Sequence, residues 1–212
     1  MKLVIMVLLT LLSNLSHADT MISKEAPNKA IPWNIEVASS SVDNDRILNR
    51  WAGVFEMGGF DSEKAASIKP RIEQAITKLS VGENATKTLL KVEIVKYMQV
   101  LGGNKGVAAA KVLLRFDSAN GSSILTNTFY VVREEAGFDV MNISNLMIDT
   151  IVSKALQIIT DGSNKTTSLV ASENVYATYE EAAAHLPNSV FGGGGLLFGA
   201  FNSVEPDWSW VK

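Results

Sequence analysis

Residues 87–132 read KTLLKVEIVKYMQVLGGNKGVAAAKVLLRFDSANGSSILTNTFYVV, and this stretch decides the fold. Apolar and polar residues alternate along it in three runs, with the two-residue period of strands that bury one face. The three runs are 87–94, 108–116 and 124–132. A glycine-rich turn at 102–106 separates the first two, and Asn120-Gly121, which accepts the positive φ angles of a hairpin, separates the last two. The sequence therefore predicts an antiparallel sheet of three or more strands with one apolar face.

Two amphipathic helices flank this meander and can cover its apolar face. The first is capped by Asp61 or Ser62 and closed by Gly82, and Pro70 inside it predicts a kink or a start near residue 69. Its apolar stripe is Ala65, Ile68, Ile72, Ala75, Ile76 and Leu79. The second spans 143–160, and its apolar face is Met147, Ile148, Ile151, Val152, Ala155, Ile158 and Ile159. The predicted fold is α+β, a three-stranded or larger antiparallel sheet covered by two helices, in the order helix, meander, helix.

Residues 1–18 have the order of a secretory signal peptide. Lys2 precedes an apolar run from Leu3 to Leu12, and the small residues Ser16 and Ala18 suit the positions before a cleavage site. The alternative, a membrane anchor, needs about 20 apolar residues, and this run is shorter. We therefore expect export, with the mature chain beginning at Asp19.

The mature chain is expected to have three parts: an extended leader over 19–34, an α+β domain over 35–162, and a C-terminal extension over 163–212. Within the domain, residues 35–38 predict a short strand. A short helix is predicted from apolar residues that recur three and four apart, namely Ile47, Leu48, Trp51, Val54 and Phe55, although residues 54–57 equally fit a strand. In the extension, Thr178 begins a capping box that opens a short helix before Pro187.

Composition excludes several classes of function. After removal of residues 1–18 the chain keeps 18 basic and 22 acidic side chains, a formal charge of −4, and it has no cluster of Lys and Arg that would bind nucleic acid. The absence of cysteine excludes disulfides, a disulfide-linked partner, a thiol nucleophile, zinc–thiolate sites and a lipid-modified cysteine. An exported chain without disulfides suits a bacterial periplasm.

No catalytic, cofactor or metal motif is complete. His185 is the one histidine of the mature chain, and no Gly-x-Ser-x-Gly sequence accompanies it. Glu181 and His185 share a spacing that two metal ligands can use, but a catalytic zinc site needs three. Gly192–Gly195 lacks the Lys-Ser/Thr of a phosphate loop, and Asp43-Asn44-Asp45 lacks the glycine of a calcium loop. We therefore expect no catalytic residues, no cofactor and no metal.

The C-terminal extension is rich in aromatic and aliphatic residues that the predicted sheet does not use. Two interpretations stay open: the tail folds back to complete the core, or it forms a contact surface, because exposed apolar patches mark interaction sites. The candidate partner-binding residues are Phe191, Leu196, Leu197, Phe198, Phe201, Trp208 and Trp210. The expected partner is an envelope protein or a membrane surface.

Residues 61–162 resemble the small envelope lipoproteins of Gram-negative bacteria, of the YajG kind and the auxiliary subunits of outer-membrane lipid transport. The resemblance rests on a helix followed by strands such as 89–94, 110–116 and 126–129, the turn at Asn120-Gly121, and a long final helix. It implies the fold and an envelope location, and the family has no catalytic residues to carry over. This chain lacks the lipidated cysteine of those proteins, so anchorage by lipid is not implied.

Together these observations predict a non-enzymatic periplasmic protein that binds an envelope partner, with a role as an auxiliary to an outer-membrane or transport assembly as one form of that function. One alternative is a module that binds a small apolar or lipid ligand between sheet and helices. Another is a periplasmic hydrolase centred on His185.

Overall fold

The centre of the fold is β3 (Val81–Leu101), a strand long enough to pair with two strands end to end along one side. Along that side β1 (Ile31–Ser41) pairs with the first part of β3, and β2 (Ile47–Trp51) pairs with its last five residues, Tyr97–Leu101. Both pairings are parallel. The interrupted edge strand formed by β1 and β2 therefore runs in the same direction as β3.

The other side of β3 continues as the predicted meander. β4 (Lys105–Ser118) pairs antiparallel with β3, and β5 (Ser123–Ala136) pairs antiparallel with β4. The short β6 (Val175–Tyr176) adds to β5 at Tyr130 and Val131. The turn between β4 and β5 contains Gly121 with φ of +86°, so the predicted hairpin is confirmed.

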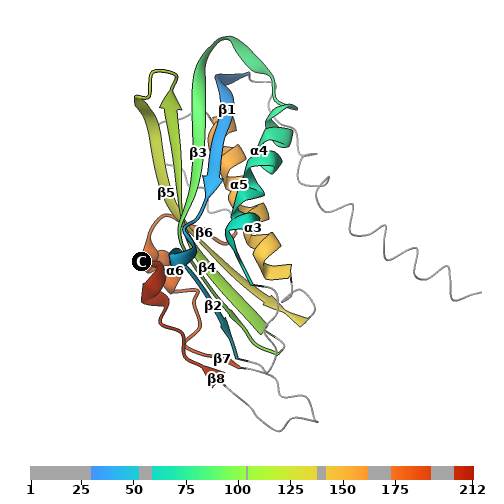
Figure 1. Cartoon of the computed structure of the whole chain (residues 1–212), viewed down its shortest axis with the longest axis vertical. Helices are drawn as coiled ribbons and strands as arrows, with labels where there is room; N and C mark the ends of the chain where they lie inside the picture. Colours follow the sequence, from blue (N-terminus) through green and yellow to red (C-terminus); the bar gives the residue numbers. More distant parts are fainter. Residues whose placement is uncertain (1–29, 53–58, 104, 138–141, 162–172, 192–202) are drawn as a thin grey trace, which may run out of the picture. The chain divides into compact units, whose positions relative to one another are not determined.

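Figure 1 shows this computed structural model, in which Ile31–Lys212 is one compact unit. The structure describes residues 30–52, 59–103, 105–137, 142–161, 173–191 and 203–212. The predicted signal peptide and residues 19–29 of the predicted leader lie outside the described residues. β1 begins at Ile31, inside the stretch assigned to the leader, and it buries Ile31, Trp33 and Val37.

The α+β class is correct, but the predicted sheet and element order are wrong in two respects. Within the described residues the sheet has six strands and is mixed rather than antiparallel, and the order is not helix, meander, helix, because β1 and β2 pair with β3 and precede the first helix. The short strand predicted over 35–38 lies within β1. Parallel neighbours need a crossover connection, which here contains the helices that follow β2. The pairing of β1 with β3 joins residues about fifty positions apart, so no local pattern reveals it.

The helix predicted around residues 47–55 is also wrong where the structure describes it, because Ile47–Trp51 is β2. Ile47 and Trp51 pack on one face of the sheet, and Leu48 packs on the other. A strand covered on both faces has apolar residues at adjacent positions, which imitates helical spacing. Asn49 further ties this strand to Phe60, whose backbone N–H it accepts at 3.0 Å and whose carbonyl it binds through Nδ2 at 2.9 Å.

Three helices cover one face of the sheet (Figure 1), which we call the inner face. The predicted first helix is two, α3 (Ser62–Ala66) and α4 (Ile68–Ile76), with the break at Ser67. Pro70 lies in the first turn of α4, where a missing N–H costs little. Asp61 caps α3 as predicted, since its carboxylate accepts the Lys64 N–H at 2.8 Å.

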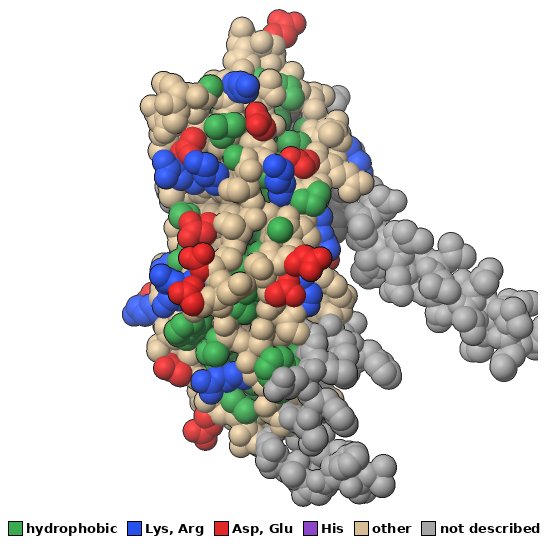
Figure 2. All heavy atoms as spheres, in the orientation of Figure 1, with side chains coloured by type: hydrophobic (Ala, Val, Ile, Leu, Met, Phe, Trp, Pro, Cys, Tyr) green, Lys and Arg blue, Asp and Glu red, His purple; other side chains and the backbone are tan. Residues whose placement is uncertain are grey.

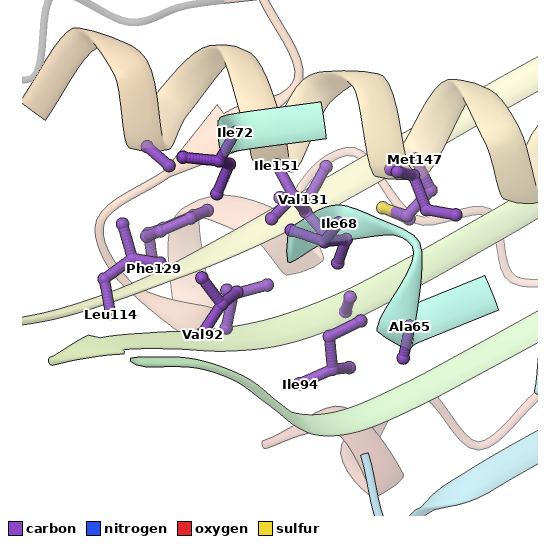
Figure 3. Close-up of a cluster of buried hydrophobic side chains, with 14 of the residues drawn as sticks. Ala65, Ile68, Ile72, Val92, Ile94, Leu114, Phe129, Val131, Met147 and Ile151 are labelled. Atoms are coloured by element: carbon purple, nitrogen blue, oxygen red, sulfur yellow. The ribbon is translucent and has the colours of Figure 1, made fainter. Parts of the chain in front are cut away.

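The last inner-face helix is α5 (Ile143–Asp161), and its predicted apolar face is confirmed. Figure 3 shows how this face meets α3 and α4 over the sheet: Met147 and Ile151 point toward Ile68 and Ile72 above the strands. From β3, β4 and β5 come Val92, Ile94, Leu114, Phe129 and Val131. All of these side chains are at most 1% exposed. No helix of the described residues is long and apolar enough to cross a membrane.

Candidate partner-binding surface

The opposite, outer face of the sheet carries a buried apolar cluster at one end. There the end of β3, the start of β4 and the end of β5 present a second buried cluster, separate from the inner core. Its sheet residues are Met98, Val100, Val107, Ala109, Tyr130 and Val132. The C-terminal residues 173–191 and 203–212 cover this cluster, and we call them the C-terminal layer.

The first helix of the C-terminal layer is α6 (Tyr179–Ala183), which buries Ala182 against the sheet. Its predicted capping box is confirmed: the Thr178 hydroxyl accepts the Glu181 N–H at 3.2 Å, and the Glu181 carboxylate accepts the Thr178 N–H at 3.3 Å. Hydrogen bonding of this kind satisfies donors that a short helix would otherwise leave open. The carboxylate of Glu181 is thus committed to the helix end.

The two tryptophans of the tail pack against the sheet in η3 (Trp208–Val211), a 3-10 helix. Trp208 is 8% exposed, and its indole Nε1–H donates to the Pro187 carbonyl at 2.8 Å. Trp210 is half-buried, with Lys96 Nζ 5.2 Å from the centroid of its ring. Asp207 begins this turn by accepting from Ser209, and these hydrogen bonds lower the pKa of Asp207.

A strand pair, β7 (Val190–Phe191) and β8 (Ser203–Val204), lies at one end of the C-terminal layer (Figure 1). Val190 is fully buried and pairs with Val204, while Phe191 pairs with Ser203 and is 64% exposed. The β7 backbone passes so close to Gly102 that a Cβ there would lie 2.1 Å from the Phe191 carbonyl oxygen. Only glycine fits this approach without movement of the backbone.

The structure separates the predicted partner-binding residues into two described groups. Phe191 is exposed, and Trp208 and Trp210 pack on the sheet. The other candidates, Leu196, Leu197, Phe198 and Phe201, lie outside the described residues, between β7 and β8 in the sequence. Partner binding by these residues stays a prediction. The packing of Trp208 and Trp210 on the sheet agrees with the first interpretation, in which the tail folds back to complete a core.

His185 lies just after α6, where its ring stacks on Tyr176 with centroids 4.6 Å apart. In the described part of the chain, no group of three or more His, Asp or Glu side chains is placed to hold a metal ion. The expectation that the protein uses no cofactor, metal or catalytic residue remains a prediction.

A small polar cluster is buried on the inner face, where β3 meets the first turn of α5. The Tyr97 hydroxyl donates to Gln99 Oε1 at 2.8 Å, and the Ser144 hydroxyl donates to the same oxygen at 3.1 Å. The Phe60 ring stacks on Tyr97 at 4.0 Å. Burial raises the pKa of Tyr97, and all three polar side chains are at most 2% exposed. Such a cluster specifies how α5 sits on the sheet.

Sequence reasoning missed the residues that hold the C-terminal layer in place. From the sequence, we interpret Lys96 and Lys111 only as charged residues of strands. Gly102 is interpreted only as a turn glycine. Their roles depend on Trp210, Lys212 and Phe191, about a hundred positions away. No local pattern signals contacts of that separation.

No family model matches the chain, and no curated protein matches it. Solved structures do resemble it. A minor lipoprotein from Acinetobacter baumannii is 11% identical with a TM-score of 0.34, over 57% of this chain and 93% of that one. An uncharacterized protein is 11% identical with a TM-score of 0.38, over 64% and 95%. A "putative lipoprotein" from Caulobacter crescentus CB15 is 14% identical with a TM-score of 0.30, over 57% and 92%.

The resemblance of this chain to small lipoproteins of Gram-negative bacteria is therefore confirmed as a likeness of structure over about 60% of its length. The chain differs from a lipoprotein in containing no cysteine. At these identities and TM-scores the likeness carries no conclusion about activity.

Proposed function

We propose that this protein is an exported, non-enzymatic component of a bacterial cell envelope that binds an envelope partner through the exposed end of β7 and β8. The location is the periplasm or the periplasmic side of the outer membrane. The order of residues 1–18 supports export, because a short basic start, an apolar run and small residues form a signal peptide.

The exposure of Phe191 carries the proposal. Large apolar side chains of the C-terminal layer are otherwise packed on the sheet, whereas Phe191 is 64% exposed beside the fully buried Val190. Burying an aromatic ring of this size against a partner stabilises a complex by about 1.5–3 kcal/mol. Val190 anchors the strand pair, so the neighbouring phenylalanine is held outward by a fixed backbone.

The sequence between the two strands extends the same apolar character. Residues 192–202 contain Leu196, Leu197, Phe198 and Phe201 and no charged residue. The pairing of Val190 with Val204 brings the two ends of this stretch together. Phe191 directly precedes this Gly-rich apolar stretch in the sequence.

The two alternatives have less support. A ligand-binding module needs room between sheet and helices, and the described side chains there form one buried apolar cluster. A hydrolase centred on His185 needs hydrogen-bond partners for its imidazole, whereas in the structure that ring stacks on Tyr176.

Site-specific photo-crosslinking in cells tests the proposal. Benzoylphenylalanine at position 191 keeps an aromatic side chain there, and the same group at Val81, 47% exposed on β3, is the matched control. We expect position 191 to form an adduct of defined mass with an envelope protein or lipid. Leu197→Asp should remove this adduct. The proposal fails if position 191 gives no adduct, or the same products as position 81.

A further inference from the structure

Two pairs of basic side chains face each other across β3 and β4 on the outer face of the sheet. Lys91 lies opposite Arg115, and Lys96 lies opposite Lys111. Like charges directly opposite each other in an antiparallel pair are destabilising. Each pair is therefore expected to have a compensating group, and the two pairs have different ones.

The C-terminal layer compensates the Lys96–Lys111 pair. Lys96 Nζ lies 5.2 Å from the centroid of the Trp210 ring, and Lys111 Nζ donates to the Lys212 carbonyl at 2.8 Å. Lys111 also lies 5.7 Å from the centroid of Tyr130. Aromatic faces and oxygen acceptors are the groups that attract ammonium ions. A segment carrying both thus lies across β3 and β4 at this pair.

A single buried carboxylate compensates the Lys91–Arg115 pair. Asp117 accepts from Arg115 Nε at 2.8 Å and from Lys91 Nζ at 3.2 Å, and its side chain is 3% exposed. Two basic groups around one acidic group leave a net charge of +1. The side chains of Lys91 and Arg115 remain 48% and 47% exposed. Within the described residues, neither forms another ion pair or a contact with an aromatic ring.

The surroundings confine where an anion can bind. The face drawn in Figure 2 carries interspersed acidic, basic and apolar side chains rather than a field of one sign. Glu93 is exposed opposite the half-buried Leu113, in the rung between the two basic pairs. Glu93 repels a carboxylate of a bound segment, so that carboxylate is confined to the neighbourhood of Lys91 and Arg115. Leu113 offers apolar surface beside these two side chains.

We propose that Lys91 and Arg115 dock an acidic, aromatic-containing segment of a partner protein, which lies across β3 and β4 as η3 does at Lys96 and Lys111. The net positive charge of Lys91, Arg115 and Asp117 favours acidic groups in the partner. The contact of Lys96 with the Trp210 ring shows that an aromatic group packs beside the other basic pair. This contact goes beyond the proposed function, because it is polar, lies on β3 and β4, and does not involve Phe191. Either surface can fail without the other.

A titration with a defined peptide tests this docking site. The probe is a blocked, fluorescein-labelled peptide of alternating Glu and Trp, and a Gln/Trp peptide is the neutral counterpart. Binding to the mature protein is followed by anisotropy, and isotope-labelled protein reports the amides that shift. We expect the Glu/Trp peptide to bind more tightly, to shift amides near Lys91 and Arg115, and to weaken as salt rises.

Single substitutions then assign the contact. Lys91→Gln and Arg115→Gln should each weaken binding about two- to fivefold, the range for an exposed ion pair. Lys69→Gln, on α4 at 40% exposure, is the matched control and should change nothing. Each substitution also removes one hydrogen-bond partner of Asp117, so if one variant unfolds, the binding of the other still decides the test.

Three results would overturn the proposal. The neutral peptide could bind as tightly as the acidic one, or Lys69→Gln could have the same effect as Lys91→Gln. Alternatively, Lys91→Gln could reduce binding to phosphatidylglycerol vesicles and leave peptide binding unchanged, which would assign the pair to an anionic lipid surface instead.

Discussion

Single residues decide how charge is accommodated on the sheet, and Asp117 is the clearest case. The hydrogen bond from Arg115, with a further contribution from Lys91, holds the pKa of Asp117 below its ordinary value. A carboxyl group whose pKa is lower in the folded state stabilises the fold at pH values above its unfolded pKa, about 3.9. That contribution is lost as the pH falls through the folded pKa.

We therefore expect Asp117→Asn to be less stable than the wild type at pH 7, and the difference to narrow as the pH falls below about 4. Urea unfolding at pH 7, 5 and 3 measures it. Glu83→Gln, exposed near the start of β3, is the control and should follow the wild type. A difference that stays constant from pH 7 to pH 3 would contradict the assigned role of the carboxylate.

At the scale of elements, the β7–β8 pair is positioned by the turn between β3 and β4. Gly102 donates its N–H to the Lys105 carbonyl at 2.7 Å, and the β7 backbone crosses directly over it. A methyl group at Gly102 would meet backbone atoms on both sides, at 2.1 Å and 2.9 Å. We expect Gly102→Ala to destabilise the protein by about 1–3 kcal/mol, because overpacking shifts the backbone.

Gly121→Ala is the matched control for this substitution. It costs about 1–2 kcal/mol for its left-handed backbone, but nothing lies within 4 Å of the added methyl group. Hydrogen exchange distinguishes the two variants, since only Gly102→Ala should speed exchange of β7 amides. Equal exchange at β7 in both variants would show that Gly102 does not position this strand.

For the whole molecule, the sheet is covered on both faces at one end and on one face at the other. The two apolar clusters lie on opposite faces of the same strands, so the C-terminal layer contributes to the stability of the domain. Substitutions at Trp208 and Phe191 distinguish this contribution to stability from the proposed partner binding. Trp208 is 8% exposed, whereas Phe191 is 64% exposed.

We expect Trp208→Ala to lower the free energy of unfolding by about 3–5 kcal/mol, the usual cost of truncating a large buried aromatic residue. Phe191→Ala should change it by no more than about 0.5 kcal/mol. Urea unfolding followed by far-UV circular dichroism compares them. If both variants are as stable as the wild type, the C-terminal layer is not part of the cooperative unit.

Much of the fold could be read from local patterns. The meander of β3, β4 and β5, the face of α5, the Asp61 cap and the Thr178 capping box all follow from residues within a few positions of one another. The candidate surface was identified less completely. The aromatic content of the tail was evident, but the opposite roles of Phe191 and Trp208 were not, since both are apolar residues in similar company.

By itself, the sequence determined the α+β class, the antiparallel meander, its covering helices and the expectation of export, because period, caps and turns act over short distances. Only the tertiary structure decided that β1 and β2 pair in parallel with β3, that the C-terminal layer packs on the outer face, and that Phe191 stays exposed. These outcomes depend on which distant segment reaches a strand edge or face, and burial there is set by three-dimensional proximity rather than by neighbours in the chain.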